Sequence, residues 1–144
     1  MNKYNFMIPL LIFALFYSGS CERQEERQSF IIQNNSSNIV VPVASRWTII
    51  DTDPGCMKPS TQQDEIAMRD NQIPPNSSKN MNGMANLLVG YPHDTLYIYL
   101  YNRIDIDNMP CDEFREKNPI QKRWAITKSD AESMNWTLIY TPEK

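Results

Sequence analysis

The chain has 144 residues and a formal net charge of −3, and hydrophobic residues make up 41% of it. This mildly acidic balance, without a patch of basic residues, argues against a nucleic-acid partner. One histidine and three cysteines are too few for zinc sites built from several histidines or from paired cysteines. The sequence has no repeat and no low-complexity run, and its length suits a single folded domain.

The first 20 residues have the form of a bacterial lipoprotein signal peptide. Lys3 supplies a positive charge, and an apolar run of 12 residues, Phe6 to Tyr17, follows it. The run fits a secretory signal, roughly 7–15 residues, and is shorter than the roughly 20 residues of a membrane-spanning helix. Ser18 to Cys21 resembles a lipobox, so we expect cleavage before Cys21 and acylation of its thiol. The alternative is an ordinary secretory signal cut near Ser20.

The segment directly after Cys21 is polar throughout. Residues 22–28 carry no apolar side chain, so we expect an acidic, flexible tether. Several acyl chains would hold the chain stably on a membrane, at about 0.8 kcal/mol for each buried methylene. An acidic stretch in this position resembles the surface-export signal of Bacteroides-type lipoproteins, although a plain spacer is an alternative. We expect an outer-membrane lipoprotein on the periplasmic or cell-surface face, with the surface favoured.

Cys56 and Cys111 are the cysteines that remain beyond the expected anchor. Disulfides persist in exported proteins, and an isolated pair has one intramolecular connectivity. A bond between them would close a loop of about 55 residues and would stabilise the fold by about 4 kcal/mol on the chain-entropy model. The alternative is that both are buried thiols that pack as small apolar side chains.

Most apolar segments of the expected domain, residues 29–144, have the pattern of short strands. We expect strands at residues 30–33, 39–43, 46–51, 95–101, 123–127 and 136–140. Turn-forming residues 34–38 predict a hairpin between the first two strands, and Pro42 places the second at a sheet edge. Within residues 52–83 we expect a helical turn or short strand at 64–70 and a loop at 76–83.

The strand at 95–101 shows the clearest alternation. Its aliphatic side chains, which we expect in the core, are Leu96, Ile98 and Leu100, and its aromatic side chains are Tyr97, Tyr99 and Tyr101. If the tyrosines face water, their rings lie about 6.5–7 Å apart and form a candidate ligand face for a sugar or a partner protein. The alternative, which we favour, packs them beneath a helix at 110–117 or beneath segment 52–83.

Two helical segments are expected in the second half. Pro110 and Asn118-Pro119 delimit a helix whose inner face carries Cys111 and Phe114. Thr127 and Asp130 form a variant capping box for one further helical turn. We expect the three domain tryptophans, Trp47, Trp124 and Trp136, to lie in strands as core residues. The elements predict a mainly β fold, an antiparallel β-sandwich or partly open barrel with one or two short helices.

Several short segments between Asp94 and Pro142 carry a family likeness. They are Asp94–Leu96, Lys122–Trp124, Ile126–Thr127 and Met134–Thr137, with Tyr140 and Pro142. Together with the opening Phe30–Ser37 they resemble a group of small Bacteroides-type lipoproteins of unknown function. The resemblance covers roughly half of the mature chain, and it implies no activity and no catalytic residues.

Few residues suggest catalysis or metal binding. His93 lies in a turn and lacks a recognisable nucleophile context, so we interpret it as a solvated loop residue. Asp105, Asp107 and Glu116 have partial EF-hand spacing, but Pro110 stands where glycine is needed. A second acidic pair, Asp51 and Asp53, begins a similar incomplete pattern. We expect solvated turns at both, no metal and no cofactor.

The sequence thus predicts a lipid-anchored envelope lipoprotein with a non-catalytic binding or structural domain. Its expected partners are the membrane, through the anchor, and a glycan or an envelope protein. The alternative function is a small glycan-directed hydrolase, in which two carboxyl groups such as those of Asp105 and Glu113 flank a glycosidic bond.

Overall fold

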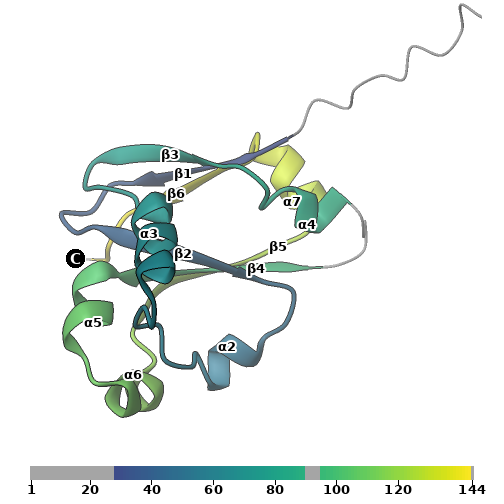
Figure 1. Cartoon of the computed structure of the whole chain (residues 1–144). Coiled ribbons are helices and arrows are strands. Elements are labelled where there is room, and N and C mark those ends of the chain that lie inside the picture. The colour runs from purple at the N-terminus through teal and green to yellow at the C-terminus, as the bar shows by residue number, and fades with distance from the viewer. Residues whose placement is uncertain (1–27, 90–94, 144) are drawn as a thin grey trace, which may run out of the picture.

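The computed structural model of the protein describes residues 28–89 and 95–143, except for the side chains of Ile49 and Val89. The expected signal peptide, Cys21, most of the tether and His93 therefore lie outside the described residues. Within them, six strands form two three-stranded sheets that lie one above the other, with short helices at the connections (Figure 1).

The two sheets have the strand orders β3-β1-β6 and β2-β4-β5. The strands are β1 (Phe30–Asn34), β2 (Val40–Ser45), β3 (Ser77–Met81), β4 (Leu96–Asn102), β5 (Ile120–Ile126) and β6 (Thr137–Tyr140). Every pairing is antiparallel except that of β1 with β6, which is parallel. The expectation of mostly antiparallel sheets is confirmed, and the strands of the described residues do not close into a barrel.

Helices take up about as much of the described chain as strands, and six short helices stand where one or two were expected. The helices are α2 (Ile49–Thr52), α3 (Gln62–Asn71), α4 (Asn86–Val89), α5 (Arg103–Asn108), α6 (Cys111–Lys117) and α7 (Lys128–Ser133). Capping boxes begin the helices α3 and α7, at Thr61 with Asp64 and at Thr127 with Asp130. The second of these was expected.

The main core lies between the two sheets. Phe30 and Ile32 of β1 face the aliphatic side of β4, which carries Leu96, Ile98 and Leu100, and all five are at most 1% exposed. The expected core face of β4 is therefore confirmed. The helices α4 and α7 add Leu88 and Ala131 at one end of this layer (Figure 1).

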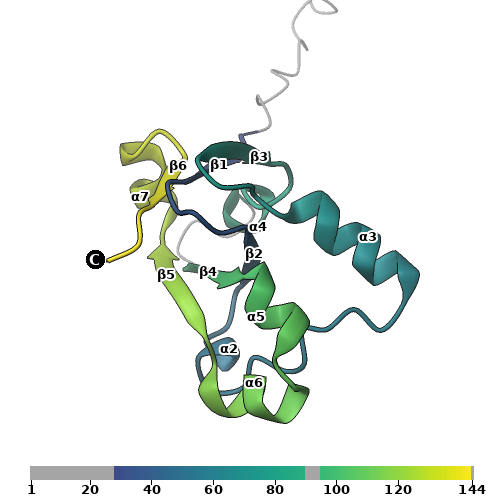
Figure 2. The ribbon, with the colours of Figure 1, turned by 90° about the vertical axis from the view of Figure 1, so that its left-hand side faces the viewer.

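A second, smaller core covers the other face of the sheet β2-β4-β5. Val41, Tyr99 and Tyr101 point away from the main core and are buried together with Ile106 of α5 and Phe114 of α6. Figure 2 shows that α2, α5 and α6 gather on this side. The sheet β2-β4-β5 thus has a core on each of its two faces.

The expected hairpin of the first two strands is not formed, because β1 and β2 belong to different sheets. Residues 34–38 form instead a corner by which the chain passes from one sheet to the other. Asn34 and Ser36 are buried there, and Asn34 Oδ1 accepts hydrogen bonds from both the amide and the hydroxyl group of Ser36. These hydrogen bonds satisfy the buried polar groups of the corner.

Three other expectations differ from the structure. Residues 46–51 leave the sheet in a bend that leads into α2, because Ser45 Oγ bonds the backbone of Trp47 and turns the chain. Trp47 is accordingly 73% exposed, whereas Trp124 is half-buried and Trp136 is buried. Residues 77–81, expected as loop, form β3 through pairing with β1. Residues 64–70, expected as a helical turn or a short strand, lie inside the helix α3, which agrees with the helical alternative.

Candidate functional site

The tyrosine row of β4 is not a ligand face, and this interpretation is corrected. Tyr99 and Tyr101 are 0% exposed, and the Tyr101 ring centroid lies 5.4 Å from that of Phe114 in α6. The Tyr101 hydroxyl group donates to Asn118 Oδ1 at 3.2 Å. Burial raises the pKa of both tyrosines. The favoured alternative was that the tyrosines pack beneath a helix at 110–117 or beneath segment 52–83. Tyr99 and Tyr101 are found packed with Phe114 of that helix and with Met57 and Met68 of that segment.

Tyr97, at the beginning of the row, is half-buried. The guanidinium carbon of Arg123 lies 4.9 Å from its ring centroid, and Arg123 Nε lies 2.9 Å from Asp51 Oδ1. The ring face is thus already covered by a cation that is itself paired. We therefore assign Tyr97, Arg123 and Asp51 a structural role beside the second core, against which Tyr97 packs.

Cys56 and Cys111 form a disulfide in the structure. It joins the segment after α2 to the first residue of α6, and both elements cover the second core. Met57, next to Cys56, packs against that core. The disulfide therefore links the two elements that cover the buried tyrosines Tyr99 and Tyr101.

The acidic clusters have structural partners. Asp105 and Asp107 lie in the helix α5 rather than in a metal-binding loop, and Asp107 pairs with Arg103 at 2.9 Å. Arg103 also bonds Glu65 of α3 at 3.0 Å. Within residues 28–89 and 95–143, no group of three or more histidine, cysteine or acidic side chains is placed to hold a metal ion.

Asp105 and Glu113 line one depression at the junction of α5 and α6, with a volume of about 370 Å³. Ile104, Asn108 and Met109 complete its lining. The Glu113 carboxylate accepts a hydrogen bond from Lys117 Nζ at 2.6 Å, so one of its oxygen atoms is already occupied. The structure therefore brings two carboxyl groups of the alternative hydrolase hypothesis to one place, with one of them engaged in an ion pair.

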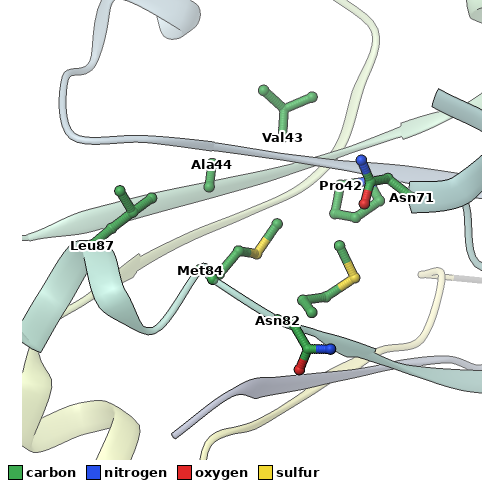
Figure 3. Close-up of a pocket in the computed structure, with 9 residues that line it drawn as sticks. Pro42, Val43, Ala44, Asn71, Asn82, Met84 and Leu87 are labelled. Carbon is green, nitrogen blue, oxygen red and sulfur yellow. The ribbon is translucent and has the colours of Figure 1, made fainter. Parts of the chain in front are cut away.

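A second hollow lies between the two sheets, where the edge strands β2 and β3 face one another (Figure 3). Its volume is about 400 Å³, within the range of ligand-binding sites. The lining residues are Pro42, Val43, Ala44, Asn71, Met81, Asn82, Gly83, Met84 and Leu87. We call this hollow the edge groove. It has no charged lining residue, and its polar side chains are two amides.

The β2 wall of the edge groove includes an unpaired length of backbone. Val40 N–H and C=O bond Ile73 on the side away from β4. Since the hydrogen-bonding groups of a strand point to alternate sides, Pro42 C=O and both backbone groups of Ala44 point to that same outer side. No group in the described part of the chain bonds them. Ile73 thus pairs with the strand at Val40, and the position opposite Ala44 is open.

The opposite wall carries three apolar side chains, those of Met81, Met84 and Leu87. The chain turns after β3 through Gly83, whose φ of +92° favours glycine, and Met84 N–H bonds Met81 C=O at 3.3 Å. Figure 3 shows Met84 and Leu87 opposite Ala44 and Pro42. Met84 and Leu87 are half-buried, whereas Met81 is 5% exposed. Methionine adapts its shape to irregular apolar partners.

The third side of the edge groove is the end of the helix α3, where Asn71 lies. Lys79 of β3 donates to the carbonyl oxygens of Asp70 and Gln72 at this helix end. A cation there satisfies carbonyl groups that lack helical partners and complements the helix dipole. The position of Asn71 relative to β3 is thereby fixed. The groove is thus bounded by the strand β2, the turn after β3 and the end of the helix α3.

Comparisons of the chain with protein-family models, with curated proteins and with solved structures gave no match. None of the helices formed by the described residues has the length and apolar character needed to cross a membrane.

Sequence reasoning identified one part of the groove and missed the rest. Pro42 indicated an edge strand, and β2 is an edge strand. Met84 and Leu87 were not identified, because the strand β3 beside them carries a polar sequence with a single buried residue, Met81. Methionines flanking Asn82-Gly83 were the available signal of a turn with an apolar side.

Proposed function

We propose that the protein is a lipid-anchored envelope lipoprotein whose folded residues are a non-catalytic binding module, with the edge groove as its ligand site. The groove is the observation that carries this proposal: it is apolar, open to solvent and bounded by ordered elements. Its volume of about 400 Å³ and its few polar groups match the usual composition of binding sites. In the same proposal the two sheets form an open β-sandwich around the main core.

The anchoring part of the proposal is supported by the sequence. Cys21 follows an apolar run of signal-peptide length, and β1 begins nine residues later, at Phe30. A short polar tether between them would keep the edge groove close to the membrane surface. We place the protein on the outer membrane, with its cell-surface face favoured, and its ligand among envelope or external molecules.

Mass spectrometry of the protein extracted from cell membranes tests the anchor. We expect an N-terminus at Cys21 with acyl groups on that residue, and a Cys21→Ala variant that stays unacylated. Recovery of a chain that still contains residues 1–20, or of an unmodified thiol at position 21, would contradict the anchor and leave the binding proposal to its own test.

A fluorescence titration with the neutral apolar dye Nile red tests the groove. We expect the dye to bind the purified chain and to lose affinity at least about tenfold in Met84→Glu, because a charge would be placed against apolar walls. The matched control is Ile139→Glu, which puts the same charge on an isoleucine that is 55% exposed on β6 and lines neither hollow. Equal dye binding by the two variants would remove the groove as the site.

A second function is favoured by one observation, the shared depression of Asp105 and Glu113. A glycoside hydrolase needs two carboxyl groups on either side of the scissile bond. Here Lys117 already engages Glu113, which is why we prefer binding. The assay is release of reducing sugar from envelope glycans, with Glu113→Gln as the variant. Turnover that disappears in Glu113→Gln would replace our proposal by the hydrolase.

A further inference from the structure

The open backbone of β2 specifies the chemistry of the ligand more closely than the apolar walls do. Resting on the binding function proposed above, we infer that the edge groove takes an extended segment of a partner protein, which adds to β2 as a short antiparallel strand. The juxtaposition that carries this is Ala44, with unpaired backbone groups, facing Met84 and Leu87 across the groove.

The chain itself begins this pairing. Ile73 occupies the antiparallel position opposite Val40, with hydrogen bonds of 2.8 and 3.1 Å. Continued in the same register, the next paired position on β2 is Pro42, and the one after it is Ala44. The chain cannot supply them, because the helix α3 ends at Asn71 and only Gln72 separates it from Ile73. A segment of three or four residues, at about 3.3 Å each, fills the position that Ile73 leaves open.

The side chains of such a segment would meet different surroundings. Those that point between the sheets would lie against Met84, Leu87 and Pro42, whereas alternate ones would point to solvent. The added segment therefore carries an apolar residue at every second position. A purely apolar ligand, such as an acyl chain, would instead bury the amide and carbonyl of Ala44 without hydrogen bonds, at a cost in free energy.

Other occupants fit the groove less well. Residues 22–27 of the chain, Glu-Arg-Gln-Glu-Glu-Arg, have no apolar side chain for the walls. A second copy would have to bring its own β2 edge into the groove, but the helix α3 stands out from the sheets on this side (Figure 2). An extended single segment avoids that obstacle.

Selection from a library of random seven-residue peptides on phage tests the inference, with the full chain as bait. We expect enriched sequences with apolar residues at alternate positions. Their binding should weaken at least about tenfold in Ala44→Pro, which removes the outward N–H and no hydrogen bond to β4. Ala44→Ser, which keeps the N–H, is the matched control and should bind within about twofold of the parent chain.

Two further measurements separate the outcomes. N-methylation of alternate backbone amides in a selected peptide should abolish binding to the parent chain, a result that holds even if Ala44→Pro does not fold. Failure of the library to yield any peptide sensitive to Ala44→Pro or to N-methylation, while Nile red still binds through Met84, would overturn strand addition but keep the groove. A dimer of the full chain that dissociates in Ala44→Pro would also overturn it, by assigning the edge to a second copy.

Discussion

Asn34 Nδ2 lies 3.1 Å from the main-chain carbonyl oxygen of Ile73, 39 residues further along the chain and inside the domain. The same amide group donates to the carbonyls of Pro74 and Asn38 at 3.0 and 2.8 Å. One buried side chain thus links the corner after β1 to the residue that pairs with β2. The position of Ile73, and with it one boundary of the edge groove, depends on this contact.

Asn34→Asp should destabilise the fold by roughly 3 kcal/mol or more. The substitution replaces the donor by a buried carboxylate that faces three carbonyl oxygens, and an uncompensated buried charge costs roughly 3–5 kcal/mol. Urea denaturation followed by circular dichroism measures the change. Asn35→Ala, at the exposed neighbouring position, is the control and should cost less than about 0.5 kcal/mol. Similar losses in the two variants would show that the contact is unimportant.

Removal of the disulfide should cost about 2–4 kcal/mol, because the cross-link joins residues 55 positions apart and restricts the unfolded chain. We expect this loss in the double variant Cys56→Ser with Cys111→Ser. The tyrosine emission should also change, because the cover of Tyr99 and Tyr101 loosens.

Reducing agent provides the control for the disulfide. It should lower the free energy of unfolding of the parent chain by a similar amount and leave that of the double variant unchanged. A parent chain whose stability does not respond to reduction would contradict the role of the bond.

Alkaline pH should destabilise the domain through Tyr101. Burial raises the pKa of this phenol above its ordinary value, which is about 10. Above that pH the unfolded chain releases the proton while the folded chain retains it. The stabilisation is therefore complete below about pH 10 and is lost as the pH rises above it.

The free energy of unfolding between pH 8 and pH 11 checks this dependence. Tyr101→Phe should flatten the alkaline loss and cost about 0.5–1.5 kcal/mol at neutral pH, because the hydrogen bond to Asn118 disappears. The same slope in Tyr101→Phe as in the parent chain would exclude Tyr101 as the titrating group.

Thr127→Ala should shorten or unwind the helix α7. Its hydroxyl group accepts a hydrogen bond from Asp130 N–H, and the Asp130 carboxylate bonds Thr127 in return. Loss of such a cap costs about 0.5–2 kcal/mol, which thermal unfolding would detect. Thr127→Ser keeps the hydroxyl group and should lie within a few tenths of a kcal/mol of the parent chain. Equal stability of the alanine and serine variants would show that the cap contributes nothing.

The sequence predicted those parts of the fold that are encoded locally. The alternation of Leu96, Ile98 and Leu100 with tyrosines specified β4 and its core face, and the residues around Thr127 specified a cap. Pairing partners were not encoded locally: residues 34–38 indicate a change of direction but not which strand lies beyond it. The polar segment 77–81 becomes β3 only because β1 lies beside it.

The helix α3 and the groove show the same limit. The helix α3 has no buried residue, so its sequence lacks the apolar stripe from which a helix is usually predicted. Thr61 and Asp64, a capping box, were the signal that was overlooked. The edge groove joins β2 to the turn after β3, about 40 positions away in the sequence, and no local pattern connects Ala44 with Met84.

Hydrogen–deuterium exchange at the amide of Ala44 tests the central claim most directly, because the proposed site requires this backbone group to be open. Val43 N–H points toward β4 within the ladder, whereas Ala44 N–H points into the edge groove. We predict that Ala44 exchanges at least about a hundredfold faster than Val43 in the chain without ligand. Protection of Ala44 equal to that of Val43 would mean that the edge is already covered, and would contradict the account.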